Sequence, residues 1–252
     1  MCLIVVAYRI HPRFPLIVAA NRDEFYQRPT AAAHFWPDHP QLLAGRDQRA
    51  GGTWLGLTRE GRFAAITNVR NGREVPPAAP RSRGELPSRF LLGSDSSRSY
   101  ARDQQPQDAH YAGYNLLLFD GQELGYHSNR YPGQQALNPG IYGLSNASLD
   151  TPWPKLLRAK RALADAVEAE EPDSEQLFRL LADPLPAPAD ALPDTGIAAE
   201  WEALLSSCFI TSADYGTRCS TLVLRSATGD TRVLERSFIP GQPPRTRHFE
   251  WS

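Results

Sequence analysis

The amino-acid sequence contains no long hydrophobic run. Its longest unbroken apolar segment lies near residues 3–8, whereas a membrane-spanning helix needs about 20 apolar residues. The first ten residues also lack the basic leader and the cleavage site of a signal peptide. We therefore expect neither an integral membrane segment nor a secretory leader.

An excess of charge of one sign is also missing. The formal net charge is −1 and the sequence pI is about 6.6, so no general electrostatic attraction draws the protein to nucleic acid or to an anionic bilayer. We expect a small-molecule partner and no nucleic-acid partner. The sequence gives no indication of the oligomeric state.

Cysteine is scarce, and Cys2, Cys208 and Cys219 are the three residues of this type. An odd number at these spacings does not form a disulfide framework, so we expect a cytoplasmic, reducing location. The six histidines are scattered, with no two of them three or four residues apart, and no glycine-rich phosphate loop follows a strand. We therefore expect no metal site and no cofactor.

The chain does have the composition of a folded globular protein. Hydrophobic residues make up 41%, aromatic residues 10% and charged residues 22%, which argues against disorder and against a coiled coil. A length of 252 residues permits one large domain or two small ones.

Strand and helix signals do not alternate regularly along the chain. Apolar or β-branched runs bounded by turn residues predict strands, and apolar residues at helical spacing predict helices. The predicted strands are 1–8, 16–20, 53–58, 62–68, 114–120, 123–128, 140–145, 208–211, 218–225 and 231–238. The predicted helices are 84–92, 96–104, 154–167, 174–181 and 201–205, and the proline-rich segment 184–193 is the one candidate linker or flap.

This order of elements favours an α+β fold over a Rossmann fold or a barrel. Residues 3–7 and 222–224 are apolar at consecutive positions, which indicates sheets covered on both faces. Two antiparallel sheets between helical layers, a four-layer αββα sandwich, would satisfy the pattern.

Cys2 is the residue that most directly suggests chemistry. An initiator methionine before a small residue is generally removed, which would leave Cys2 with a free α-amine. That amine titrates near about 7.7–8.0 and a free thiol near about 8.5, so one residue would carry a nucleophile and its own general base. The arrangement suits acyl transfer and hydrolysis of C–N bonds; the alternative is a small buried residue on a strand.

Polar residues follow the second predicted strand. Alternation along a strand sends Asn21 and Asp23 to one face and Arg22 to the other, where a carboxylate, an amide and a cation would serve such a nucleophile. The alternative is that this stretch is only a polar turn. Trp153 and Lys155 also have two interpretations, as a helix-opening contact with a surface charge or as residues at the mouth of a pocket.

Several motifs together carry a family resemblance. They are M-C at the start, A-N-R-D-E-F at 20–25, G-G-T-W-L-G at 51–56, T-N at 67–68, G-Y-N at 113–115, G-L-S-N at 143–146, L-D-T-P-W-P-K at 149–155 and Y-G-T-R at 215–218. With these motifs the chain resembles the NRDE family, the group that includes the eukaryotic transport-and-Golgi-organisation protein two. The match spans almost the whole chain, so we expect a single domain over residues 1–252.

The resemblance implies a fold and a site. The family looks related to the N-terminal-nucleophile hydrolases, whose fold is a four-layer αββα sandwich. Likeness to their cysteine branch, which includes penicillin V acylase and bile salt hydrolase, implies Cys2 as nucleophile, Asp23 as the carboxylate that holds its amine, Asn68 and Asn146 at oxyanion or amine-positioning places, and Arg218 beside the pocket. That branch usually has Arg before the Asn of the second strand, whereas this chain has Ala20 there and an arginine at position 22.

The function expected from these residues is an N-terminal cysteine amidohydrolase or acyltransferase for a small amide or acyl substrate, a hydrolase of C–N bonds other than peptide bonds. The alternative is a non-catalytic carrier of haem, lipid or acyl-CoA on the same fold. A trafficking adaptor is a third alternative, and no surface run of charge in the sequence supports it.

Overall fold

The computed structural model describes residues 2–131 and 135–252, except for the side chains of Cys2 and Gln135. Contacts within the chain divide it into two compact units. Unit 1 comprises Met1–Gln27, Arg70–Arg73 and Pro139–Ser252, and unit 2 comprises Arg28–Val69 and Glu74–Asn138.

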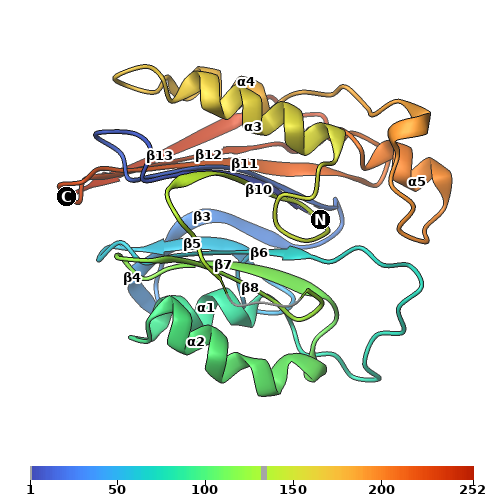
Figure 1. The fold of residues 1–252 in the computed structure, drawn as a ribbon, viewed down its shortest axis with the longest axis horizontal. Coiled ribbons are helices and arrows are strands. Elements are labelled where there is room, and N and C mark those ends of the chain that lie inside the picture. Colours follow the sequence, from blue (N-terminus) through green and yellow to red (C-terminus); the bar gives the residue numbers. More distant parts are fainter. Residues whose placement is uncertain (1, 132–134) are drawn as a thin grey trace. The chain divides into compact units, whose positions relative to one another are not determined.

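Unit 1 is built on a six-stranded antiparallel sheet in the order β10-β1-β2-β11-β12-β13 (Figure 1). Its strands are β1 (Cys2–Tyr8), β2 (Leu16–Phe25), β10 (Gly140–Leu144), β11 (Tyr215–Arg225), β12 (Thr231–Ser237) and β13 (Arg245–Trp251). Helices α3 (Pro154–Ala166) and α4 (Ser174–Leu181) cover one face, and α5 (Ala199–Leu204) and the short 3-10 turn η2 (Ala189–Ala191) follow them.

The two covering helices begin where the sequence allows a helix to begin. Pro154 occupies the first turn of α3, where its missing N–H costs no hydrogen bond. Asp173 caps α4 by accepting hydrogen bonds from the N–H groups of Glu175 and Gln176, which satisfies donors that the helix itself leaves unpaired. Local sequence therefore fixes both starting points.

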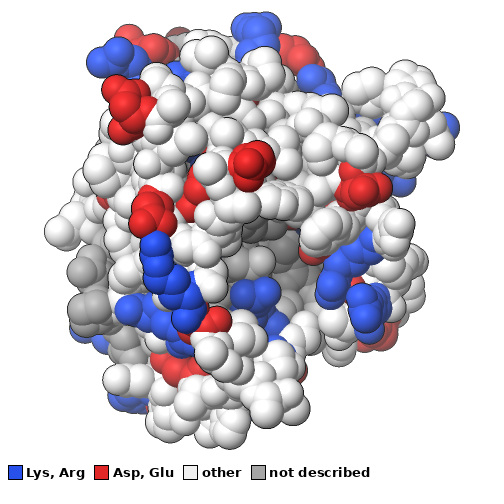
Figure 2. Space-filling view, turned by 90° about the vertical axis from the view of Figure 1, so that its right-hand side faces the viewer, with Lys and Arg blue, Asp and Glu red and all other residues white. Residues whose placement is uncertain are grey.

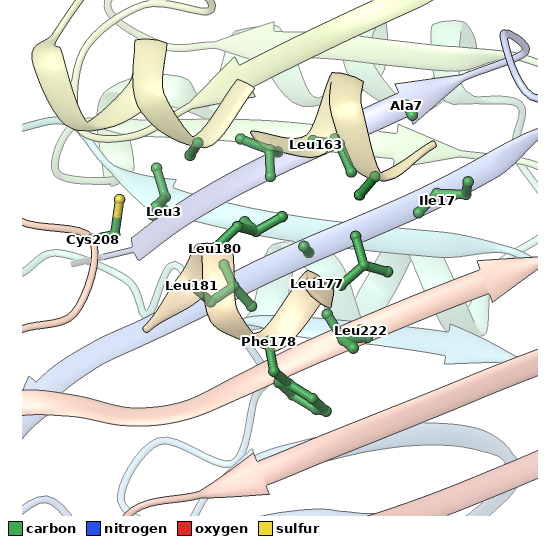
Figure 3. Packing of buried hydrophobic residues seen from close by; sticks show 14 of the residues in the cluster. Leu3, Ala7, Ile17, Leu163, Leu177, Phe178, Leu180, Leu181, Cys208 and Leu222 are labelled. Atoms are coloured by element: carbon green, nitrogen blue, oxygen red, sulfur yellow. The ribbon is translucent and has the colours of Figure 1, made fainter. Parts of the chain in front are cut away.

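The core of unit 1 lies between this sheet and these helices (Figure 3). Leu3, Val5 and Ala7 of β1 pack against leucines of α3 and α4, including Leu163 and Leu177. Burying one such side chain stabilises the fold by about 1.5–3 kcal/mol. The alternate residues of β1 are buried too, so the central strands are covered on both faces, as the consecutive apolar positions predicted.

Unit 2 contains a seven-stranded antiparallel sheet in the order β3-β4-β5-β6-β7-β8-β9. Its strands are β3 (Thr30–Trp36), β4 (His39–Asp47), β5 (Leu55–Thr58), β6 (Phe63–Asn68), β7 (Tyr114–Phe119), β8 (Leu124–Ser128) and β9 (Gln135–Ala136). Helices α1 (Glu85–Leu92) and α2 (Ser97–Gln104) and the turn η1 (Gln105–His110) complete it, and α1 packs on β5 and β6. Residues such as Leu86, Phe90 and Tyr114 form its core.

The G-G-T-W-L-G motif has a structural explanation within unit 2. Gly51 has a φ of 79°, a left-handed conformation that favours glycine. Trp54 packs against the core cluster of this unit, and a Cβ on Gly45 would lie 2.2 Å from its ring. The motif is therefore a turn followed by a core tryptophan.

Most predicted elements are present, and some predictions were wrong. Strands β3, β4 and β13 were missed because their side chains are largely half-buried or exposed and give no clear apolar alternation. The predicted strand 208–211 is instead a buried loop with a single isolated bridge between Thr211 and Gly216. Strand β2 extends to Phe25, so the N-R-D-E stretch lies in a strand and the polar-turn interpretation was wrong.

The prediction that the proline-rich segment 184–193 is a linker was wrong. Both of its flanks belong to unit 1, and the chain passes between the units elsewhere. Hydrogen bonds tie the segment down, from Arg158 to the carbonyl of Leu185 and from the N–H of Ala187 to the hydroxyl of Ser206. The segment is thus an anchored part of unit 1.

Candidate active site

Cys2 begins β1, so its backbone position is set by pairing with β2. The register places Cys2 opposite Arg22 and Leu3 opposite Asn21. On its other side β1 pairs with β10, with Ile4 opposite Leu144. The predicted nucleophile therefore starts a central strand, while its side chain lies outside the described residues.

Asp23 is a buried carboxylate one residue beyond the partner of Cys2. It is 1% exposed, and its Oδ1 accepts a hydrogen bond of 2.7 Å from the Thr217 hydroxyl. That hydroxyl accepts a hydrogen bond of 2.9 Å from the N–H of Ile210, so its own proton is directed to Asp23. Burial raises the pKa of Asp23, and the positive charges of Lys155 and Arg22 oppose that rise.

The side chain of Asn21 makes hydrogen bonds that connect several elements of unit 1. Its Nδ2 donates to the carbonyls of Leu181 and Cys208 at 2.8 and 2.9 Å, and its Oδ1 accepts from the Ser220 hydroxyl at 2.6 Å. These bonds connect β2 to the end of α4, to the loop at 208 and to β11. The structure thus gives Asn21 a positioning role on the same strand face as Asp23.

Arg22 supplies a cation close to the start of β1. Its side chain is 6% exposed and lies 3.8 Å from the carboxylate of Glu24. Both Cys2 and Cys219 are register partners of Arg22, one on each neighbouring strand. Arg22 therefore lies within the cross-strand row that contains Cys2.

Arg218 lies in a β-bulge. The register of β2 with β11 shifts between Thr217 and Cys219, and such an extra residue bends a strand and redirects its side chains. Arg218 donates a hydrogen bond of 2.9 Å to the carbonyl of Phe25. Burial lowers its pKa, and the nearby charge of Arg22 lowers it further. Two arginines thus lie near one another at this end of the sheet.

Glycine in the Y-G-T-R motif is required by close packing. A Cβ on Gly216 would lie 2.2 Å from the Tyr26 hydroxyl and 2.6 Å from the carbonyl of Ile210. The loop at 208–211 can therefore approach β11, and the N–H of Thr217 donates to the carbonyl of Ile210 at 2.8 Å. This contact holds Thr217 in place to bond Asp23.

The two predicted oxyanion residues lie in different units. Asn146 is a buried residue of unit 1, two positions after Leu144. Leu144 of β10 pairs with Ile4 of the antiparallel strand β1, so the chain at Asn146 continues toward the end of β1 where Cys2 lies. Its Oδ1 accepts from the Ser145 hydroxyl at 3.3 Å. Asn68 ends β6 in unit 2, where it pairs with Tyr114. Unit 1 holds all the predicted site residues except Asn68.

Thr217 and Arg70 are polar residues of this region that the sequence did not single out as functional, and Lys155 was predicted either as a surface charge or as a residue at the mouth of a pocket. Lys155 is 2% exposed and donates a hydrogen bond of 2.8 Å to the carbonyl of Leu205, so its interpretation as a surface charge was wrong. Arg70 pairs with Glu202 at 3.0 Å and lies over the ring of Trp153. For Lys155, the signal in the sequence was that the chain has only two lysines, both in one helix.

The remaining thiols are buried. Cys208 packs in the core of unit 1, and burial raises its pKa to about 12, so it is unreactive near neutral pH. Across the described ranges 2–131 and 135–252, no three His, Cys, Asp or Glu residues form a group able to hold a metal ion. Within the same ranges no helix is long and apolar enough to cross a membrane.

The surface charges are mixed. Figure 2 shows acidic and basic side chains interspersed on the visible face, with no area of one sign. Ion pairs join charged residues of unit 1, for example Arg73 with Asp194 at 2.6 Å and Arg158 with Asp183 at 2.8 Å. This face therefore offers no extended electrostatic attraction for a polyanion.

Sequence comparisons match this chain to other proteins over nearly its full length. A family model described as "Transport and Golgi organisation 2" matches residues 1–240. The Transport and Golgi organization 2 homolog of Mus musculus is 37% identical over 260 residues, covering 95% of this chain and 94% of the relative. The Bos taurus homolog is 38% identical, covering 97% and 96%, and the Drosophila melanogaster protein is 26% identical, covering 100% and 96%.

Two solved structures share the fold. A Caenorhabditis elegans N-acylethanolamine-hydrolyzing acid amidase ortholog has a TM-score of 0.51 at 10% identity, covering 88% of this chain and 92% of that chain. A mutant conjugated bile acid hydrolase from Clostridium perfringens has a TM-score of 0.53 at 7% identity, covering 100% and 97%. The predicted α+β fold of the N-terminal-nucleophile hydrolase type is confirmed.

Proposed function

This chain belongs to the Transport and Golgi organisation 2 family, and from its N-terminal-nucleophile hydrolase-like fold we propose that it is an N-terminal cysteine amidohydrolase or acyltransferase. The observation that carries the proposal is the pairing of Cys2 with Arg22, next to the buried carboxylate of Asp23. The two similar solved structures are described as an amidase and a bile acid hydrolase. The substrate class is a small amide or acyl compound.

The proposed reaction begins with removal of Met1, which frees the α-amine of Cys2. The amine takes the thiol proton, and the thiolate attacks the substrate carbonyl carbon. The tetrahedral intermediate collapses, the C–N bond breaks, and the leaving amine receives that proton. Water, or an acceptor amine in the transferase case, then attacks the thioester while the α-amine takes its proton; the C–S bond breaks, the acyl group leaves and the proton returns to the Cys2 thiolate.

Each polar residue has a stated role in this proposal. Asp23 holds the protonated amine, and Thr217 keeps that carboxylate oriented through its hydrogen bond of 2.7 Å. Arg22 stabilises the thiolate as a nearby cation. Asn146 is assigned to the developing oxyanion, and Arg218 to contact with the substrate.

The test combines intact mass with selective alkylation. We expect the purified protein to lack Met1 and iodoacetamide to label Cys2 alone, at a rate that falls in the Asp23→Asn variant. Cys219→Ala is the matched control, because it removes the other thiol in the Arg22 row and leaves the labelled residue unchanged. Retention of Met1 would remove the base from the mechanism and refute it.

Activity is then measured on a panel of small amides and acyl-CoA thioesters, with Cys2→Ala as the inactive reference. Turnover of an amide with release of the amine supports the hydrolase, and turnover that needs an acceptor amine supports the transferase. A substrate turned over equally by Cys2→Ala would be processed elsewhere.

A surface groove in unit 1 favours a second candidate function, the carriage of haem, a lipid or an acyl-CoA by its apolar part. The groove has a volume of about 330 Å³, and its lining includes Phe209, Phe238 and Ile239 but no charged side chain. Haem titration tests the haem-carrier case: a Soret band that vanishes in Cys2→Ala indicates binding through the thiol. A band unchanged in Cys2→Ala but lost in Phe238→Asp indicates carriage in the groove, and a band unchanged in both variants indicates nonspecific uptake.

A further inference from the structure

A small cavity of unit 1 lies beside the start of α3. Its volume is about 10 Å³, and the residues that line it include Arg70, Trp153, Lys155, Leu205 and Ser206. Among the described residues of this lining, Arg70 and Lys155 are charged, and both are buried cations. Buried positive charge is costly unless negative charge compensates it, so the cavity is a candidate anion site.

The guanidinium of Arg70 is fixed in place, yet it keeps donors unused. Its Nη2 pairs with the Glu202 carboxylate at 3.0 Å, and it lies over the Trp153 ring, 4.6 Å from the ring centre. Glu202 is itself held, because its Oε1 accepts hydrogen bonds from the N–H and the hydroxyl of Thr195 at 2.7 and 2.6 Å.

Two other nitrogens of Arg70 lack a hydrogen-bond partner. Within the described part of the chain no acceptor bonds to its Nε or its Nη1, although the side chain is 4% exposed. Buried donors are rarely left unpaired in folded proteins. Because Arg70 lines the cavity, these donors indicate a ligand there that accepts hydrogen bonds.

The start of α3 attracts an anion to the same place. Trp153, Pro154 and Lys155 line the cavity, and Trp153 is the N-cap of this 13-residue helix, where its side chain accepts no capping hydrogen bond. The amino end of a helix carries partial positive charge and favours a bound anion. Lys155 is held there by a hydrogen bond of 2.8 Å to the carbonyl of Leu205. Arg70, Lys155 and the helix end therefore all favour negative charge in the cavity.

We propose that this cavity binds a monatomic anion, chloride, between Arg70 and the start of α3. The volume decides the class of ligand, because about 10 Å³ admits about one water-sized group, which excludes phosphate and larger oxyanions. The ion accepts hydrogen bonds from the Arg70 guanidinium, and Lys155 adds a second positive charge. Among the described residues, the buried carboxylates of Glu202 and Asp23 are not part of the lining, so neither fills the cavity. The site does not depend on Cys2 or on the proposed reaction.

Urea unfolding in sodium chloride and in sodium gluconate, at equal ionic strength, tests the site without any activity measurement. Gluconate is too large for the cavity and serves as the reference anion. At a chloride concentration about ten times the dissociation constant, the ratio of folded to unfolded protein should rise about tenfold. Line broadening in chloride NMR of the native protein supplies that dissociation constant. Equal stability in the two salts would overturn the proposal.

Variants assign the effect to this cavity. Arg70→Met combined with Glu202→Gln removes the guanidinium without leaving an uncompensated buried carboxylate, and this double variant should lose both the stabilisation and the line broadening. Lys155→Met should weaken chloride binding, and it keeps the test decisive if the double variant does not fold. Arg73→Met is the matched control with a native response, because its exposed pair with Asp194 is not part of the lining. An unchanged chloride response in Lys155→Met or in the double variant would show an adventitious ion only and would overturn the site.

Discussion

The hydroxyl of Thr217 is the most sharply testable contact of the site. It donates to Asp23 at 2.7 Å and accepts from the N–H of Ile210 at 2.9 Å. Thr217→Val keeps the shape of the side chain and removes both hydrogen bonds. The substitution leaves a buried carboxylate without one donor and a buried N–H without its acceptor.

The size of the effect follows from these two losses. A hydrogen bond to a charged group contributes about 1.5–3 kcal/mol, and an unsatisfied buried donor costs about 1–3 kcal/mol. Because one hydroxyl serves both bonds, the two losses overlap, and we expect Thr217→Val to lower the free energy of unfolding by about 3 kcal/mol at pH 7. Urea unfolding followed by the fluorescence of the five tryptophans measures it.

The same substitution changes the pH dependence of stability. Burial raises the folded-state pKa of Asp23 above its ordinary value of 3.8, so the folded state holds its proton more tightly than the unfolded state does. The free energy of unfolding therefore falls as pH rises from about 4 through the folded-state pKa. Thr217→Val raises that pKa further and enlarges the fall, whereas Asp23→Asn abolishes this contribution.

Thr217→Ser retains the hydroxyl and controls for the change of side chain. Thr221→Val, at another buried position of β11, controls for the exchange of threonine for valine. The reasoning is refuted if Thr217→Val costs less than about 0.5 kcal/mol or has the same pH dependence as Thr217→Ser.

Two further predictions concern the buried charges and thiols of unit 1. Arg70→Met should destabilise the fold by about 3–5 kcal/mol, because it leaves Glu202 buried without its cation. Adding Glu202→Gln should recover much of that loss, as measured by urea unfolding. Equal losses in the single and double variants would contradict this prediction. Cys208 should stay unlabelled by iodoacetamide in the native protein at pH 8 and become labelled in urea, because burial raises the pKa of its thiol to about 12. Peptide mass mapping measures the labelling, and a label on Cys208 in the native protein would contradict this prediction.

Of the strands that carry the site, β1 was visible in the sequence because it is apolar at nearly every position, whereas β2 and β11 were predicted without the ends that hold Asn21, Asp23 and Thr217. The runs that became β1, β6, β7 and β8 were predicted within two residues of their bounds. Strand β13 escaped because it is an edge strand of mainly exposed charged and polar residues, a pattern equally typical of a loop. The 208–211 run was misread because buried loops can be as apolar as strands.

The sequence by itself determined the α+β class, the likeness to the family, and the special position of Cys2 beside the A-N-R-D-E-F motif, because composition, hydrophobic patterning and motif spacing are properties of the chain. The tertiary structure decided which polar side chains serve Asp23. Thr217, which lies 194 positions further along the chain, pairs with Asp23 beside a β-bulge and donates a hydrogen bond to its carboxylate. Burial and strand register bring these groups together, and neither can be read from the order of residues.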